Sequence, residues 1–156
     1  MEKLKEILVR QAMNNDLVFV RPDTKIYEVA RLMTEHHLHS LPVTGDDRRV
    51  IGIIAESDLF LKEKGMPFSA VRLPILFERW VDPAQLVEIY ENAAHHTAAD
   101  VMTTEVICIN ASDTLERAAW LMVRKDVRSL PVVDENNRLV GMLSRKDFIR
   151  ILAEAE

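Results

Sequence analysis

The chain is poor in the features that mark several protein classes. It has one cysteine among 156 residues, Cys108, which excludes an intrachain disulfide and leads us to expect a reducing, cytoplasmic location. No apolar run approaches the roughly 18 residues of a membrane span, and the first ten residues contain no signal-peptide core. The net charge of −5 argues against a surface for nucleic acids or anionic membranes, which requires clustered Lys and Arg.

Signatures of catalysis and of metal binding are also missing. The sequence contains none of the motifs G-x-S-x-G, H-E-x-x-H, G-x-G-x-x-G or G-x-x-x-x-G-K-[ST]. The histidines at 36, 37, 39, 95 and 96 have no cysteine nearby, and adjacent histidines on a helix point in different directions. We therefore expect no catalytic residues, no metal site and no enzymatic activity.

The sequence is instead rich in self-similarity. The tetrapeptide at 40–43, Ser-Leu-Pro-Val, recurs at 129–132, an offset of 89 residues. The same offset, without a gap, relates three further pairs: Met13 and Met102, Gly52 and Gly141, Asp58 and Asp147. A register held through such a length indicates two copies of one structural unit.

Each copy predicts the element order β-α-β-β-α. In the first copy we expect a strand at 17–20, hairpin strands at 41–44 and 50–55, and a closing helix from 56. In the second copy we expect hairpin strands at 130–133 and 139–144 and a closing helix from 145, with Asp113 capping the earlier helix. Both copies show the i, i+3, i+4, i+7 spacing of a buried helix face, at Ile26, Val29, Ala30 and Met33, and at Leu115, Ala118, Ala119 and Met122.

The segment between the copies predicts one more helix. Asp82 followed by Pro83 is typical of a helix start, and a stretch as long as 63–96 is improbable as a structureless loop. The expected domains are repeat one at 8–62, a linker with an extra helix at 63–96, and repeat two at 97–154. The fold class is α/β (α+β), with two units too small to be stable alone forming one pseudo-two-fold pair.

The order and spacing of these motifs resemble the cystathionine-β-synthase (CBS) domain pair, or Bateman module. The resemblance covers residues 8–62 and 97–154 and implies a stand-alone pair that binds AMP, ADP, ATP or S-adenosylmethionine in the cleft between its copies. The family's ligand motif is glycine, two apolar residues, Ser or Thr, two further residues and aspartate. The second copy contains it whole at 141–147, where it implies ligand contacts from Leu143, Ser144, Arg145, Lys146 and Asp147.

The physical chemistry of this motif suits a nucleotide. A carboxylate such as that of Asp147 can accept bonds from both ribose hydroxyls, and a helix N-terminus favours phosphate. The resemblance places Arg128 near the phosphate and assigns the adenine pocket of this site to Val18, Leu38 and His39 of the other copy.

The first copy departs from the motif, so the second cleft is expected to be weaker. Ala55 replaces the hydroxyl and Glu56 adds a negative charge, whereas Ser57 and Asp58 remain. The resemblance adds Ile107 and Val127 to this second cleft.

Two functions remain open at this point. The first is a non-catalytic sensor of an adenosine-containing ligand that regulates another protein. The second is a dimerisation or protein-interaction module with no physiological nucleotide. For either, the resemblance and the apolar residues of the closing helices predict a homodimer.

Overall fold

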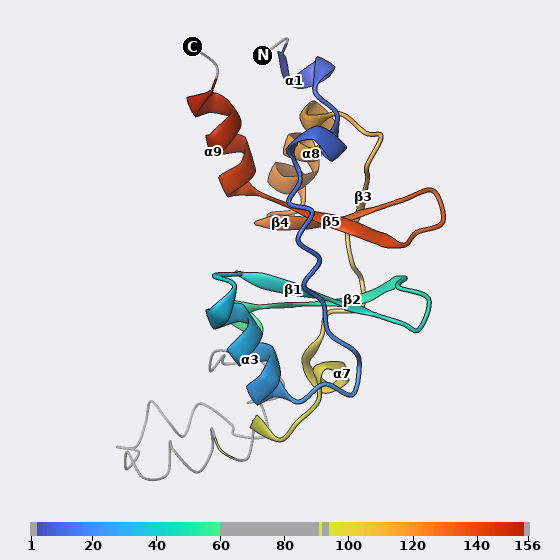
Figure 1. Cartoon of the computed structure of the whole chain (residues 1–156), viewed down its shortest axis with the longest axis vertical. Coiled ribbons are helices and arrows are strands. Elements are labelled where there is room, and N and C mark those ends of the chain that lie inside the picture. The colour runs from blue at the N-terminus through green and yellow to red at the C-terminus, as the bar shows by residue number, and fades with distance from the viewer. Residues whose placement is uncertain (1–2, 60–90, 92–93, 155–156) are drawn as a thin grey trace. The chain divides into compact units, whose positions relative to one another are not determined.

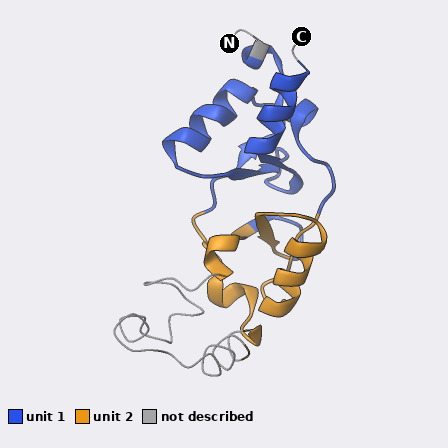
Figure 2. Cartoon of the chain, turned by 90° about the vertical axis from the view of Figure 1, so that its left-hand side faces the viewer, with its two compact units in different colours: residues 1–17, 46–50, 106–156 blue, residues 18–45, 51–105 orange. Residues whose placement is uncertain are grey.

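The structure, a computed structural model, describes residues 3–59, 91 and 94–154. Two compact units divide the chain (Figure 2). Unit 1 contains Met1–Leu17, Asp46–Val50 and Val106–Glu156, and unit 2 contains Val18–Gly45 and Ile51–Glu105. Each unit therefore combines most of one repeat with a segment from elsewhere in the chain. The repeat boundaries at 8–62 and 97–154 remain a prediction.

Helices and short strands alternate along the described residues (Figure 1). In chain order the elements are α1 (Lys3–Glu6), α2 (Val9–Ala12), α3 (Ile26–Glu35), β1 (Ser40–Thr44), β2 (Val50–Ala55), α4 (Glu56–Leu59), α7 (Ala98–Val101), β3 (Ile109–Asn110), α8 (Leu115–Arg124), β4 (Ser129–Val133), β5 (Leu139–Ser144) and α9 (Arg145–Ala153). None of the helices in the described part of the chain has the length and apolarity that a membrane span needs.

Unit 1 is built on a three-stranded sheet. Strand β4 is central, pairing in parallel with β3 and antiparallel with β5, and α8 and α9 lie on the same side of this sheet (Figure 1). The N-terminal helices α1 and α2 pack against α8, and α2 also contacts β5 and α9. The core consists of fully or almost fully buried side chains: Val9, Ala12, Ile109, Leu115, Ala118, Met122, Leu130, Val132 and Leu143.

Unit 2 has the two-stranded hairpin β1–β2, and α3, α4 and α7 pack with it. Val20 forms a parallel bridge with Val43, so the chain before α3 runs alongside β1. The core of this unit comprises Val20, Ile26, Val29, Met33, Leu41, Val43, Ile54, Ala98 and Val101.

The expected element order is confirmed in outline. Both helix faces are buried, apart from Ala30 and Ala119, which are partly exposed, and both closing helices begin where expected, at 56 and 145. The strand expected at 17–20 is wrong except for the single bridge at Val20. The N-cap of α8 is Thr114, which accepts from the Arg117 amide, rather than Asp113. The linker helix expected from Asp82 lies outside the described residues.

A methionine from a distant segment fills the space over one glycine in each unit. In unit 1, residue 14 pairs with Met142 through two backbone hydrogen bonds of 2.8 and 3.0 Å, and Met13 lies against Gly141. In unit 2, Thr103 pairs with Ile53, and Met102 lies against Gly52. Because glycine has no Cβ, each of these positions leaves space over the strand, and the methionine side chain fills that space.

We predict that Gly141→Ala costs more stability than Gly52→Ala. A Cβ at 141 would lie 2.6 Å from Met13 Sδ and 2.9 Å from the backbone oxygen of Asn14, whereas the nearest atoms to a Cβ at 52 all belong to the flexible Met102 side chain. Overpacking of this kind costs about 1–3 kcal/mol. Denaturant unfolding measures the difference. Met102→Ala should largely rescue Gly52→Ala, whereas Met13→Ala should rescue Gly141→Ala less completely; equal rescue would contradict the prediction.

Candidate functional site

The end of β5 and the start of α9 form a closed hydrogen-bonded box. Asp147 Oδ2 accepts from the Ser144 backbone amide at 2.7 Å and from Ser144 Oγ at 2.8 Å. Ser144 is the N-cap of α9 and Asp147 is the third residue of the helix, which is the spacing of a capping box. The box fixes the Asp147 carboxylate at the N-terminus of a nine-residue helix.

The other carboxylate oxygen of Asp147, Oδ1, can still accept a hydrogen bond. Arg150 Nη2 approaches Asp147 Oδ1 at 3.5 Å, the outer limit of a hydrogen bond, and the Asp147 side chain is 14% exposed. A carboxylate has about four lone-pair sites, and Ser144 uses two of them on Oδ2. Oδ1 is therefore the Asp147 oxygen with the greater capacity to accept a further hydrogen bond. Sequence reasoning missed Arg150, although its i, i+3 spacing from Asp147 was readable on the predicted helix.

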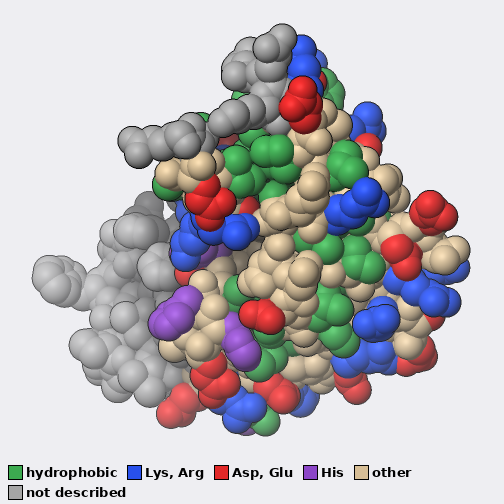
Figure 3. Space-filling view, turned by 45° about the horizontal axis from the view of Figure 1, so that its top comes forward, with side chains coloured by type: hydrophobic (Ala, Val, Ile, Leu, Met, Phe, Trp, Pro, Cys, Tyr) green, Lys and Arg blue, Asp and Glu red, His purple; other side chains and the backbone are tan. Residues whose placement is uncertain are grey.

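Three exposed basic residues surround this helix start. The Arg145 amide donates to the Arg128 carbonyl at 3.2 Å, which holds the start of α9 against the residues before β4. The Arg145 guanidinium reaches the Val127 carbonyl at 3.4 Å and Asp126 Oδ1 at 3.7 Å. Among the described residues, no side-chain partner is found for Arg128 or Lys146. The positive charge here is local, because Lys, Arg, Asp and Glu side chains are interspersed over the face drawn in Figure 3.

The matching region of unit 2 has the same backbone contacts but different charge. The Glu56 amide donates to the His39 carbonyl at 2.9 Å, and Asp58 Oδ2 accepts from the Ala55 amide at 2.8 Å. Ala55 has no hydroxyl to complete the box. Glu56 Oε2 lies 3.0 Å from His39 Nδ1, so an acid pairs with the residue that corresponds to Arg128. Ser57 lies between Glu56 and Asp58 in α4.

The remaining residues expected at the sites lie in both units. Leu143 is fully buried in the core of unit 1, so its side chain is not available to a ligand, and the contact expected from Leu143 remains a prediction for its backbone. Ile107 and Val127 are half-buried against that same core, whereas Val18 and Leu38 pack against the core of unit 2. The structure brings Arg128, Ser144 and Asp147 together in unit 1; the combination of residues from both copies remains a prediction.

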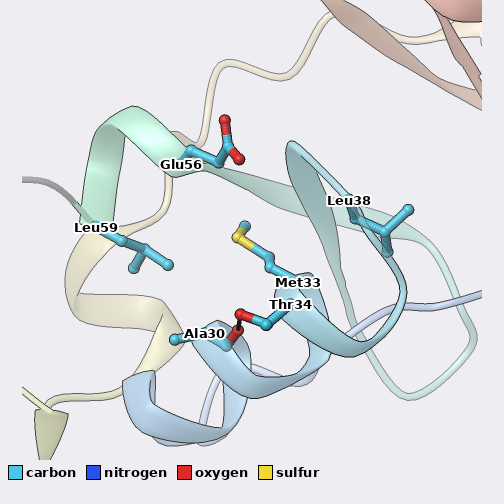
Figure 4. A pocket seen from close by; sticks show the side chains of 6 residues that line it. All are labelled: Ala30, Met33, Thr34, Leu38, Glu56 and Leu59. Carbon is cyan, nitrogen blue, oxygen red and sulfur yellow. Dashed lines mark hydrogen bonds between the residues drawn. The ribbon is translucent and has the colours of Figure 1, made fainter.

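Unit 2 contains a pocket of about 280 Å³ (Figure 4). Its lining is apolar except for the Glu56 carboxylate and the Thr34 hydroxyl, and this hydroxyl donates to the Ala30 carbonyl. Of the residues that the sequence analysis discusses for the two ligand sites, the pocket includes Leu38 and Glu56. Ser57 and Asp58 are not part of its lining.

Two acids outside the candidate site have lowered pKa values and serve local structure. Hydrogen bonds from the Thr97 backbone and side chain, with His96 nearby, lower the pKa of Asp100 at the start of α7. The Arg138 backbone amide is the main cause of the lowered pKa of Asp134 in the β4–β5 turn. Within the described part of the chain, no group of three or more His, Cys, Asp or Glu side chains is placed to hold a metal ion.

A model described as the CBS domain matches residues 5–64 and 98–154. The chain belongs to the CBS-domain family. The two CBS repeats expected from the motifs are thereby confirmed, as is the tandem fold. CBS-domain pairs are generally regulatory modules.

Individual relatives agree with this family assignment. The uncharacterized protein MJ1426 of Methanocaldococcus jannaschii is 30% identical over 156 residues, which cover 94% of this chain and 91% of that protein. The chloroplastic CBS protein CBSX2 of Arabidopsis thaliana is 28% identical over 86% of the chain, which spans 58% of CBSX2.

Solved structures of CBS domains superpose over nearly the whole chain. The CBS-pair protein CBSX2 has a TM-score of 0.75 at 25% identity, covering 96% of each chain. The CBS domain of a CBS domain-containing membrane protein from Sphaerobacter thermophilus has a TM-score of 0.73 at 26% identity, covering 96% of this chain and 90% of the other.

We predict that Cys108 is a slow nucleophile. The residue is half-buried, and burial raises the pKa of its thiol to about 11 because the thiolate is poorly solvated. At pH 8 only about one thiol in a thousand is then ionised, and the thiolate is the reactive form. Modification by a thiol reagent should accelerate about tenfold per pH unit between pH 8 and 10. A rate that levels off below pH 9 would show an activated thiol instead.

Proposed function

We propose that this CBS pair is a non-catalytic, cytoplasmic regulatory module that binds an adenosine-containing ligand, either a nucleotide (AMP, ADP or ATP) or S-adenosylmethionine. The observation that carries the proposal is the Ser144–Asp147 box, with Oδ1 of Asp147 left to accept and Arg128 and Lys146 beside it. The carboxylate suits ribose hydroxyls, and the adjacent cations and helix N-terminus suit phosphate. AMP has been found bound to the relative CBSX2, which supports this ligand class.

The repeat that contains Asp58 offers a weaker half-site in this proposal. Ala55 lacks the hydroxyl of Ser144, and Glu56 with its partner His39 stands where the other repeat has Arg145 and Arg128. A hydrogen bond from a hydroxyl contributes about 0.5–1.5 kcal/mol net. A carboxylate in place of a cation beside a phosphate costs about another 1 kcal/mol at a partly exposed position.

A second candidate function, an interaction module without a nucleotide, has its own support in unit 1. The side chains of Ile149 and Leu152 on α9 are 65% and 70% exposed, and those of Trp120 and Val123 on α8 are 59% and 82% exposed. Such apolar surface on helices is typical of protein contacts. A homodimer through these helices is compatible with both functions.

We predict that the Asp147 half-site binds AMP about tenfold more tightly than the Asp58 half-site, because the two differences above sum to at least 1.4 kcal/mol. Calorimetry with AMP on Asp147→Asn and Asp58→Asn, a pair matched at the offset of 89 residues, measures this. Asp147→Asn should remove the tight phase and Asp58→Asn should leave it. The preference should shrink with adenosine, which lacks the phosphate, and as salt rises. The reverse pattern would show that the competent half-site was misassigned.

We predict that the chain forms a homodimer. Ile149→Glu combined with Leu152→Glu should lower the affinity of dimerisation at least tenfold, since each substitution places a charge in an apolar contact. Light scattering at micromolar concentration measures the mass. Asn136→Glu, in the exposed β4–β5 turn, controls for added charge and should remain dimeric. A wild-type monomer would exclude the dimer. A dimer that binds none of the adenosyl ligands would favour the second function.

A further inference from the structure

The N-terminal segment, residues 3–17, is attached to unit 1 at both of its ends. Near its start, the Val9 amide donates to the Asp113 carbonyl at 2.8 Å, and the Ile7 carbonyl accepts from the Leu115 amide at 2.9 Å. Near its end, Asn14 pairs with Met142 of β5. The segment therefore joins the start of α8 to the strand that leads into Ser144 and Asp147.

Arg150 connects this segment directly to the candidate ligand carboxylate. Its Nη2 donates to the Ala12 carbonyl at 2.7 Å and also lies 3.5 Å from Asp147 Oδ1. Ala12 is the last residue of α2, and the carbonyls at the C-terminus of a helix have no amide donor within that helix. The Arg150 side chain is 54% exposed, whereas that of Asp147 is 14% exposed, so the arginine is the solvent-facing partner of the pair. One guanidinium nitrogen thus serves both the end of α2 and Asp147.

We infer that Arg150 is a positioning residue that couples ligand occupancy at Asp147 to the N-terminal segment. The part of this inference that concerns the ligand rests on the proposed function. A ligand hydroxyl that donates to Oδ1 of the fixed carboxylate shields the contact between Asp147 and Arg150 from water, which strengthens this contact and so holds Arg150 against Ala12. Linkage makes the effect reciprocal: a segment that holds Arg150 beside Oδ1 favours the ligand.

The coupling belongs to one repeat. The first repeat has a leucine, Leu61, at the position 89 residues before Arg150, and a leucine cannot bridge a carboxylate and a carbonyl. Position 61 therefore gives an adenosyl ligand at the Asp58 half-site no counterpart of the Arg150 bridge to residues 98–103, which stand in unit 2 where residues 9–14 stand in unit 1. Within the described residues, the bridge is found at the Asp147 half-site.

Hydrogen exchange tests the coupling. The amides of Met13 and Asn14 are bonded to the carbonyls of Val9 and Met142, so they exchange when the segment opens. Without ligand, Arg150→Met and Asp147→Asn should each speed exchange at these amides about twofold to fivefold, the range for a half-exposed ion pair. Arg150→Lys should restore part of the protection, and Arg124→Met, an exposed arginine of α8, should change nothing.

Saturating AMP then separates coupling from mere stability. AMP should slow exchange at Met13 and Asn14 about twofold to fivefold in the wild type and in Arg124→Met. In Arg150→Met it should leave these amides unchanged, although calorimetry still detects AMP binding. An Arg150→Met response equal to that of the wild type would overturn the coupling, as would unchanged ligand-free exchange in Asp147→Asn. A wild type that binds none of AMP, ADP, ATP and S-adenosylmethionine would refute the proposed function, and the ligand-free comparison would still test the contact.

Discussion

Space above Gly141 and Gly52 is scarce, and this limits which segments can complete each unit. A Met side chain occupies the place of a Cβ at both positions, so the segments that contain Met13 and Met102 lie flat against β5 and β2. Lying flat allows residue 14 to pair with Met142 and Thr103 to pair with Ile53. The contacts of Ile7 with Leu115 and of Ala12 with Arg150 follow from the same placement in unit 1.

The geometry of the candidate site follows from how α9 starts. A strand that runs directly into a helix leaves the first amides of the helix without partners, and a Ser-x-x-Asp sequence satisfies them locally. Asp147 is therefore held by the fold itself, with one oxygen committed to Ser144 and the other turned to Arg150. A carboxylate fixed in advance loses little side-chain entropy when it accepts a ligand hydroxyl. The structural role of Asp147 is thus compatible with the binding role proposed for the same side chain.

Local sequence patterns predict the local structure and fail where distant segments decide. The offset of 89 residues, the two buried helix faces and both hairpins were readable because their periodicity and turn residues act within a few positions. The assignment of residues 3–17 to unit 1 was not readable, because it depends on Met13 meeting a glycine 128 residues later. The left-handed residues were hidden as well: none of the four is glycine, namely His37, Arg48, Asp126 and Asn137.

The two repeats share backbone contacts at the start of their closing helices but differ in side-chain charge there, and the proposal of two unequal half-sites depends on this difference. The amide at 145 bonds to the carbonyl at 128, just as the amide at 56 bonds to that at 39. At these four positions the side chains are arginine with arginine in one repeat and glutamate with histidine in the other. The Arg145 guanidinium lies 3.7 Å from the exposed carboxylate of Asp126, whereas no side-chain partner is found for Arg128 among the described residues. Glu56 Oε2 lies 3.0 Å from His39 Nδ1, so an anion at this position would meet the carboxylate of Glu56 and a His39 side chain that already has a partner. If the proposed function holds, the shared backbone would set the position of a ligand, and the side-chain charges would decide which ligand is favoured.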